Sequence, residues 1–95
     1  MKKFRRQESV TLSATYRSAG TLTAPDTYTI EVRDPSGQIV VDSQTMTEDD
    51  TGKYSYEYTS SATAMEGVYV AEAVLITGTN KQRPYCEFEI LEEIP

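Results

Sequence analysis

The sequence predicts an all-β protein, because three observations along its 95 residues agree. Apolar and polar residues alternate with a period close to two, which is the pattern of strands that bury one face. Turn-forming residues recur about every 8–12 residues, a spacing typical of a β-sandwich or a small barrel. No segment longer than one turn has the period of an amphipathic helix, so parallel strands with helical crossovers are not expected.

The first half of the chain is predicted to hold strands over 10–16, 28–33 and 39–41. In the first of these, apolar residues such as Val10 and Leu12 alternate with threonine and serine. The segment Asp34-Pro35-Ser36-Gly37 fits a type I turn, with Asp first, Pro second and Gly fourth. It therefore predicts a hairpin between the second and third strands.

The second half is predicted to hold a loop over 48–52 and then three strands, over 54–59, 68–76 and 84–91. A polar connection with little strand character separates the first two of these strands. The total is six or seven strands in one domain over residues 8–91. A flexible basic arm, 1–7, precedes this domain, and a short tail, 92–95, follows it.

Five segments resemble those of bacterial and phage immunoglobulin-like domains in the same order. They are Ser9-Val10-Thr11-Leu12, the run from Tyr28 to Gly37, Thr51-Gly52-Lys53-Tyr54 with Tyr56 and Tyr58, Gly67-Val68-Tyr69-Val70-Ala71, and Phe88-Glu89-Ile90. The resemblance covers residues 8–91 and implies a two-sheet antiparallel immunoglobulin-like sandwich of six or seven strands. It implies an architecture and no catalytic residues, since related patterns occur in macroglobulin-like modules, adhesin repeats and small proteins of tailed-phage particles.

Charge is distributed unevenly between the arm and the body. Lys2, Lys3, Arg5 and Arg6 are four of the nine basic residues, whereas all fifteen acidic residues follow them. An acidic body repels phosphates, so nucleic-acid binding by the folded part is not expected. The arm is either a frayed, solvated terminus or a contact to an acidic partner or to another copy of the chain.

The sequence contains no signal for export or membrane insertion. Residues 1–30 lack the apolar run of a signal peptide, and no stretch approaches the length of a membrane span. The expected location is therefore the cytoplasm or an assembled particle such as a virion, although a domain cut from a longer secreted chain would have the same features. Together with the resemblance and the start at Met1, this favours a phage or prophage component.

Residues suited to catalysis are scarce. The chain has no histidine, which is the commonest general base and metal ligand, so an enzyme is not expected. Cys86 is the only cysteine and shares its strand parity with Phe88 and Ile90, which predicts a buried small hydrophobe rather than a reactive thiol. No cofactor is expected.

Two features offer a ligand-binding alternative. Glu48, Asp49 and Asp50 are weak candidates for a calcium site, since Ca²⁺ takes carboxylate oxygens from loops, but a solvated acidic turn is the simpler interpretation. Tyrosines 54, 56 and 58 would stack on sugar rings if exposed. Their polar neighbours in the strand indicate instead that the tyrosines face the core.

The run from Val68 to Ile76 is apolar on both faces. If Tyr69 and the alternate residues on its side of the strand face the core, the opposite side faces outward. That side is a candidate partner interface and carries Val68, Val70, Val74 and Ile76. Ordinary β-branched strand residues flanked by neighbours are the alternative. The favoured function is a non-catalytic structural or protein-interaction module whose partner is a protein, including another copy of itself, with a carbohydrate- or calcium-binding module as the alternative.

Overall fold

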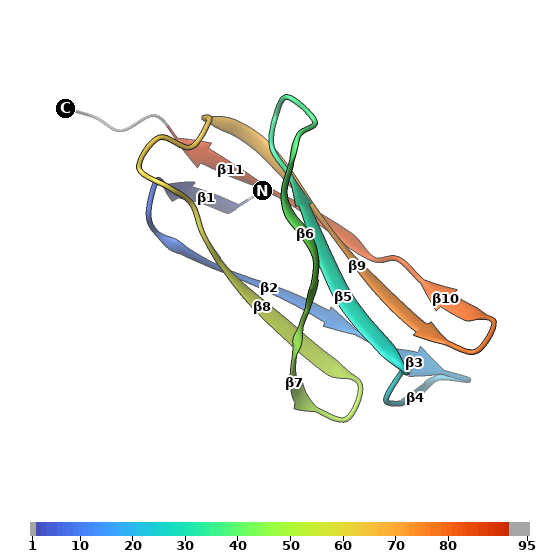
Figure 1. Ribbon diagram of the computed structural model, residues 1–95. Helices are drawn as coiled ribbons and strands as arrows, with labels where there is room; N and C mark the ends of the chain where they lie inside the picture. Colours follow the sequence, from blue (N-terminus) through green and yellow to red (C-terminus); the bar gives the residue numbers. More distant parts are fainter. Residues whose placement is uncertain (1, 92–95) are drawn as a thin grey trace.

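The computed structural model describes residues 2–91, and this part of the chain consists of strands and turns without a helix (Figure 1). The all-β prediction is confirmed. The strands are β1 (Lys2–Arg5), β2 (Ser9–Thr15), β3 (Arg17–Ser18), β4 (Thr21–Leu22), β5 (Thr27–Arg33), β6 (Ile39–Thr45), β7 (Thr47–Asp50), β8 (Lys53–Thr59), β9 (Gly67–Thr77), β10 (Asn80–Gln82) and β11 (Tyr85–Leu91).

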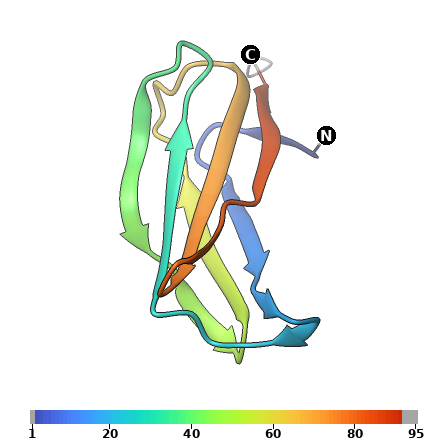
Figure 2. The same ribbon diagram turned by 90° about the vertical axis from the view of Figure 1, so that its right-hand side faces the viewer.

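The strands form two larger sheets that face each other as layers (Figure 2). The six-stranded sheet has the order β1-β11-β9-β5-β6, with β10 also paired to β9, and the three-stranded sheet has the order β2-β8-β7. The chain passes from the first sheet to the second at Met46, which is buried between β6 and β7. A separate two-stranded sheet, β3-β4, lies at one end.

The core lies between the two layers, because alternate residues of their strands point toward each other. In β2 the burial alternates strictly, with Val10, Leu12 and Ala14 buried and their neighbours exposed. Aromatic rings join the layers: Tyr28 of the larger sheet stacks on Tyr54 of the smaller one with ring centroids 4.5 Å apart. The buried hydrophobic residues are Val10, Leu12, Ala14, Tyr16, Ile30, Val32, Val41, Met46, Tyr54, Tyr69, Ala71, Ala73, Leu75, Phe88 and Ile90.

The tyrosines of β8 face this core, as their polar neighbours predicted. Tyr54 is fully buried, and Tyr56 and Tyr58 are partly buried and packed against the core cluster. They therefore do not form an exposed aromatic row for a sugar ring. The hairpin predicted between β5 and β6 is also present, closed by a hydrogen bond from the Gly37 amide to the Asp34 carbonyl of 2.9 Å.

The connection that enters β9 is closed by a tyrosine hydroxyl. Tyr69 lies near the start of β9, is buried, and donates a 2.6 Å hydrogen bond to the carbonyl oxygen of Met65. Its ring stacks on that of Phe88 with a centroid distance of 5.3 Å. One side chain therefore anchors both the core and the backbone of the preceding connection.

The N-terminal segment differs from the expected flexible arm. Residues 2–5 form β1, which pairs with β11 in parallel, so the strands are not all antiparallel. The Phe4 ring meets Phe88 edge-on at 6.2 Å, and the Arg6 Nε donates a 2.6 Å hydrogen bond to the Ala64 carbonyl. This strand could not be predicted from the sequence, because a single phenylalanine among four basic residues gives no alternating pattern.

The eleven strands within residues 2–91 exceed the six or seven expected, for two reasons. Short strands such as β3 and β4, of two residues each, are set by tertiary pairing and leave no period to detect. In addition, the predicted loop over 48–52 begins as strand β7, since Glu48 pairs with Tyr54 and Asp50 with Lys53. Its acidic composition favours a loop, but the neighbouring edge of β8 overrides that preference.

Candidate functional site

The outer face of the six-stranded sheet carries the aliphatic row predicted from the sequence. Val68, Val70, Val74 and Ile76 all lie on β9 and alternate with the buried residues Tyr69, Ala71, Ala73 and Leu75. Val68 is 36% exposed, and the other three are partly buried. Because β9 is a central strand between β5 and β11, the row runs along the middle of the sheet.

Charged residues on the neighbouring strands border this row. Val70 lies between Arg33 of β5 and Glu87 of β11, and Val68 lies beside Glu89. Long side chains of this kind can cover neighbouring aliphatic surface with their methylene groups. Neighbours within the sheet are thus sufficient to account for the partial burial of the row, and Val68 at its end is the most exposed member.

Glu72 divides the row into two halves. It lies directly opposite Glu31 of β5, and each carboxylate has its own arginine: the Arg83 guanidinium contacts Glu72, and Arg33 Nε lies 3.3 Å from Glu31 Oε2. The two arginines offset the repulsion between the carboxylates. A partner of this face thus meets two aliphatic patches separated by a strip of paired charges.

Two exposed apolar residues extend the face beyond the predicted row. Tyr85 is 70% exposed and lies opposite Glu72, while Ile39 is 40% exposed and lies opposite Arg33. Neither was predicted as a site residue. The parity of Tyr85 with Glu87 could have identified it, whereas Ile39 follows a register shift in β6 that sequence alternation cannot locate.

The acidic segment gives no metal site within residues 2–91, where no group of three or more His, Cys, Asp or Glu side chains could hold an ion. Glu48 accepts a 3.0 Å hydrogen bond from the Tyr54 hydroxyl. Asp50 accepts a 2.8 Å hydrogen bond from the Thr51 amide. Asp49 is exposed on the same strand. All three residues are exposed and spread along an edge strand.

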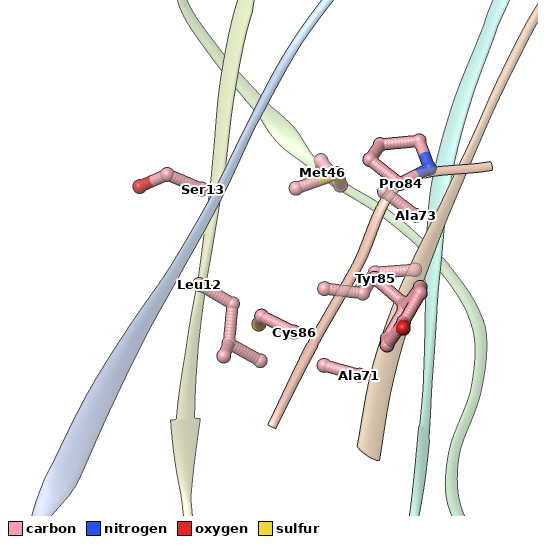
Figure 3. Close-up of a pocket in the computed structure, with 9 residues that line it drawn as sticks. Leu12, Ser13, Met46, Ala71, Ala73, Pro84, Tyr85 and Cys86 are labelled. Atoms are coloured by element: carbon pink, nitrogen blue, oxygen red, sulfur yellow. The ribbon is translucent and has the colours of Figure 1, made fainter. Parts of the chain in front are cut away.

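Cys86 is exposed, so its predicted burial is wrong. It has the inward parity of Phe88, but β1 pairs only with the Phe88–Leu91 part of β11 and leaves the start of β11 uncovered. The thiol lies at a small hollow of about 40 Å³ near Leu12, Ala71 and other core residues (Figure 3). Partial burial raises the pKa of the thiol, and the charge of Lys2 acts in the opposite direction.

A second, larger hollow of about 320 Å³ runs from Cys86 along β2 and is lined by Val10, Leu12, Phe88 and Lys2, among others. It is the open side of the core between β11 and β2, two strands of different sheets. Its lining also includes the carboxylate residue Glu87 and the hydroxyl residues Thr11 and Ser13.

Comparisons of the chain with protein-family models, with curated proteins and with solved structures find no match. Residues 2–91 also contain no helix of the length and apolar character that a membrane crossing requires.

Proposed function

We propose that this protein is a non-catalytic protein-interaction module with an immunoglobulin-like sandwich fold, and that it docks through the outer face of the six-stranded sheet. The observation that carries the proposal is the row Val68, Val70, Val74 and Ile76 on that face, extended by the exposed Tyr85. An aliphatic surface with an exposed aromatic residue and a charged border has the composition of a protein interface.

The strand order supports the immunoglobulin-like part of the proposal. An immunoglobulin domain places its second, fifth and fourth strands in one sheet and its third, sixth and seventh in the other. Here β2-β8-β7 corresponds to the first set and β5-β9-β11 to the second, with β6 as an added edge strand. The Tyr69 hydroxyl bonded to the Met65 carbonyl matches the tyrosine corner that such domains have at the start of their sixth strand.

The charge around the face favours a protein partner over a nucleic acid. Three carboxylates lie at the aliphatic row: Glu87 and Glu89 border it on the β11 side, and Glu72 interrupts it. Acidic groups repel phosphates. A particle or surface assembly, as in a phage or prophage, is the setting that fits this function. Capsid or tail genes beside the coding sequence would support that setting, and a neighbourhood of unrelated metabolic genes would oppose it.

Site-specific photo-cross-linking in the native host tests the docking face. Benzoylphenylalanine at Tyr85 replaces an exposed aromatic residue, and the same probe at Glu57, exposed on the outer face of the other sheet, is the matched control. We expect a discrete cross-linked protein from position 85 and none from position 57. Adding Val70→Thr and Val74→Thr, which keep the β-branched shape, should abolish the product.

Equal cross-linking from both positions, or a product that survives the two threonine substitutions, would refute the assignment of this face. Absence of any product from position 85 would refute the interaction itself. A circular dichroism melt of the double threonine variant shows whether it is folded at the temperature of the experiment, so that loss of the product is assigned to the surface.

A further inference from the structure

The two larger sheets expose edge strands of opposite charge. β1 ends the six-stranded sheet and carries Lys2, Lys3 and Arg5, whereas β7 ends the three-stranded sheet and carries Glu48, Asp49 and Asp50. Each strand is four residues long, and all six charged residues are exposed. Ion pairs within residues 2–91 join only Arg33 with Glu31 and Arg83 with Glu72, so these six charges are unpaired in that part of the chain.

The two edges lie on opposite flanks of the molecule. β1 is at one end of its sheet and β6 at the other, and β6 continues through Met46 directly into β7 (Figure 2). β1 therefore pairs with β11 and not with β7 in the same molecule. A contact between β1 and β7 therefore requires two copies of the chain.

Charged residues on edge strands normally prevent sheets from joining. That protection works between edges of like charge, because like charges opposite each other in a strand pair are destabilising. It fails between β1 and β7, where the charges attract. Between these two edges, charge therefore disfavours β1–β1 and β7–β7 pairing and favours β1–β7 pairing.

We propose that copies of this chain associate head to tail, with β1 of one copy pairing antiparallel to β7 of the next. In the register that sets Lys3 opposite Asp50, both of these side chains lie on the outer faces of their sheets. Glu48 faces the other side of β7, beside Tyr54, because the register of β7 shifts between Glu48 and Asp50. Such a contact uses different surfaces on the two partners and generates a ring or an open chain of subunits. It is separate from the outer face of β9 and does not depend on the function proposed for that face.

Charge-reversed variants and their mixture test the proposal by sedimentation velocity. The Lys3→Glu/Arg5→Glu variant has two acidic edges, and the Asp49→Lys/Asp50→Lys variant has two basic edges. We expect the wild type to self-associate at millimolar concentration in low salt, and each variant to associate at least about tenfold more weakly. The mixture should associate again, because the acidic β7 of the first variant meets the basic β1 of the second.

The control is Asp42→Lys/Glu66→Lys, which makes the same change in net charge as Asp49→Lys/Asp50→Lys at exposed positions outside β1 and β7. It should associate as the wild type does. The wild-type association should also weaken between about 20 mM and about 500 mM salt, since the shorter Debye length screens exposed charges.

A wild type that stays monomeric at millimolar concentration in low salt would overturn the proposal. A mixture of the two folded variants that remains monomeric would also overturn it, because the mixture restores an acidic β7 facing a basic β1. A general charge effect between the two variants would produce only weak association, without specificity for these edges. To separate these causes, cross-strand disulfides are formed between copies carrying Lys3→Cys and Asp50→Cys in a Cys86→Ser background. The proposal requires a mixed 3–50 disulfide and is contradicted if 3–3 and 50–50 disulfides form as readily.

Discussion

Replacing Tyr69 by phenylalanine removes one hydroxyl and leaves the core ring in place. The hydroxyl donates a 2.6 Å hydrogen bond to the Met65 carbonyl, while the ring keeps its stacking partner Phe88 at 5.3 Å. A net hydrogen bond contributes roughly 0.5–1.5 kcal/mol, and a buried acceptor left without a partner adds a further cost. Met65 is 46% exposed, so water can replace the lost donor, and we expect a loss of about 1 kcal/mol.

Urea unfolding followed by far-UV circular dichroism measures this loss as a lower midpoint with an unchanged slope. The same change lowers the melting temperature by about 4–8 °C for a domain of this size. Tyr85→Phe is the matched control, since that residue is 70% exposed and its loss of a hydroxyl should leave stability unchanged. If Tyr69→Phe is as stable as the wild type, the hydroxyl does not anchor the connection before β9, and one support for the immunoglobulin-like assignment is lost.

Three further predictions concern backbone strain, pH and thiol chemistry. Gly52→Ala should destabilise by about 2 kcal/mol or more, because φ is 75° and the new Cβ would lie 2.8 Å from the Tyr16 carbonyl oxygen. Gly20→Ala, with a similar φ of 81° and no atom within 4 Å, should cost only about 1 kcal/mol in the same urea titration, and equal costs would contradict the clash. Burial, with a smaller effect from the Glu48 hydrogen bond, raises the pKa of Tyr54 from 10.0 to about 12. Because the phenol ionises at a lower pH in the unfolded chain, the contribution of Tyr54 to stability is complete below pH 10 and is lost as the pH rises toward 12. The urea midpoint of Tyr54→Phe should therefore decline less steeply at alkaline pH than that of the wild type. An equally steep decline would contradict this. Cys86 should react with Ellman's reagent in the folded protein because it is exposed, but more slowly at pH 8 than in urea, since its raised pKa leaves less thiolate; an unreactive folded thiol would contradict the exposure.

Much of the fold could be predicted from local alternation and turn chemistry. The strict alternation of Val10, Leu12 and Ala14 predicts β2, and the Asp34–Gly37 turn predicts the hairpin, because each of these signals is contained within a few consecutive residues. The short pairings of β3 with β4 were not predictable, since a strand of two residues has no period. They depend on which segments the rest of the fold brings together.

The face of β9 was predictable for the same reason as its core. In a strand, knowing that Tyr69 and Ala71 point inward is enough to place Val68 and Val70 on the outside. Cys86 shows where this reasoning ends. Its position in the strand places the side chain on the inward side, as predicted. Alternation predicts the side on which a residue lies but not whether a neighbour shields it from solvent, and β1 pairs only with the later part of β11.

Edges are less predictable from sequence than faces, because an edge is defined by the absence of a neighbour and therefore by the whole topology. The basic segment at 2–5 has the composition of a solvated terminus, and the acidic segment at 48–50 has that of a loop. Only the strand order places them at the ends of two different sheets, on opposite flanks. Charges that carry no structural signal in the sequence thereby lie on two strand edges of opposite sign in the fold, and the proposed pairing between copies is the arrangement that brings these two edges together.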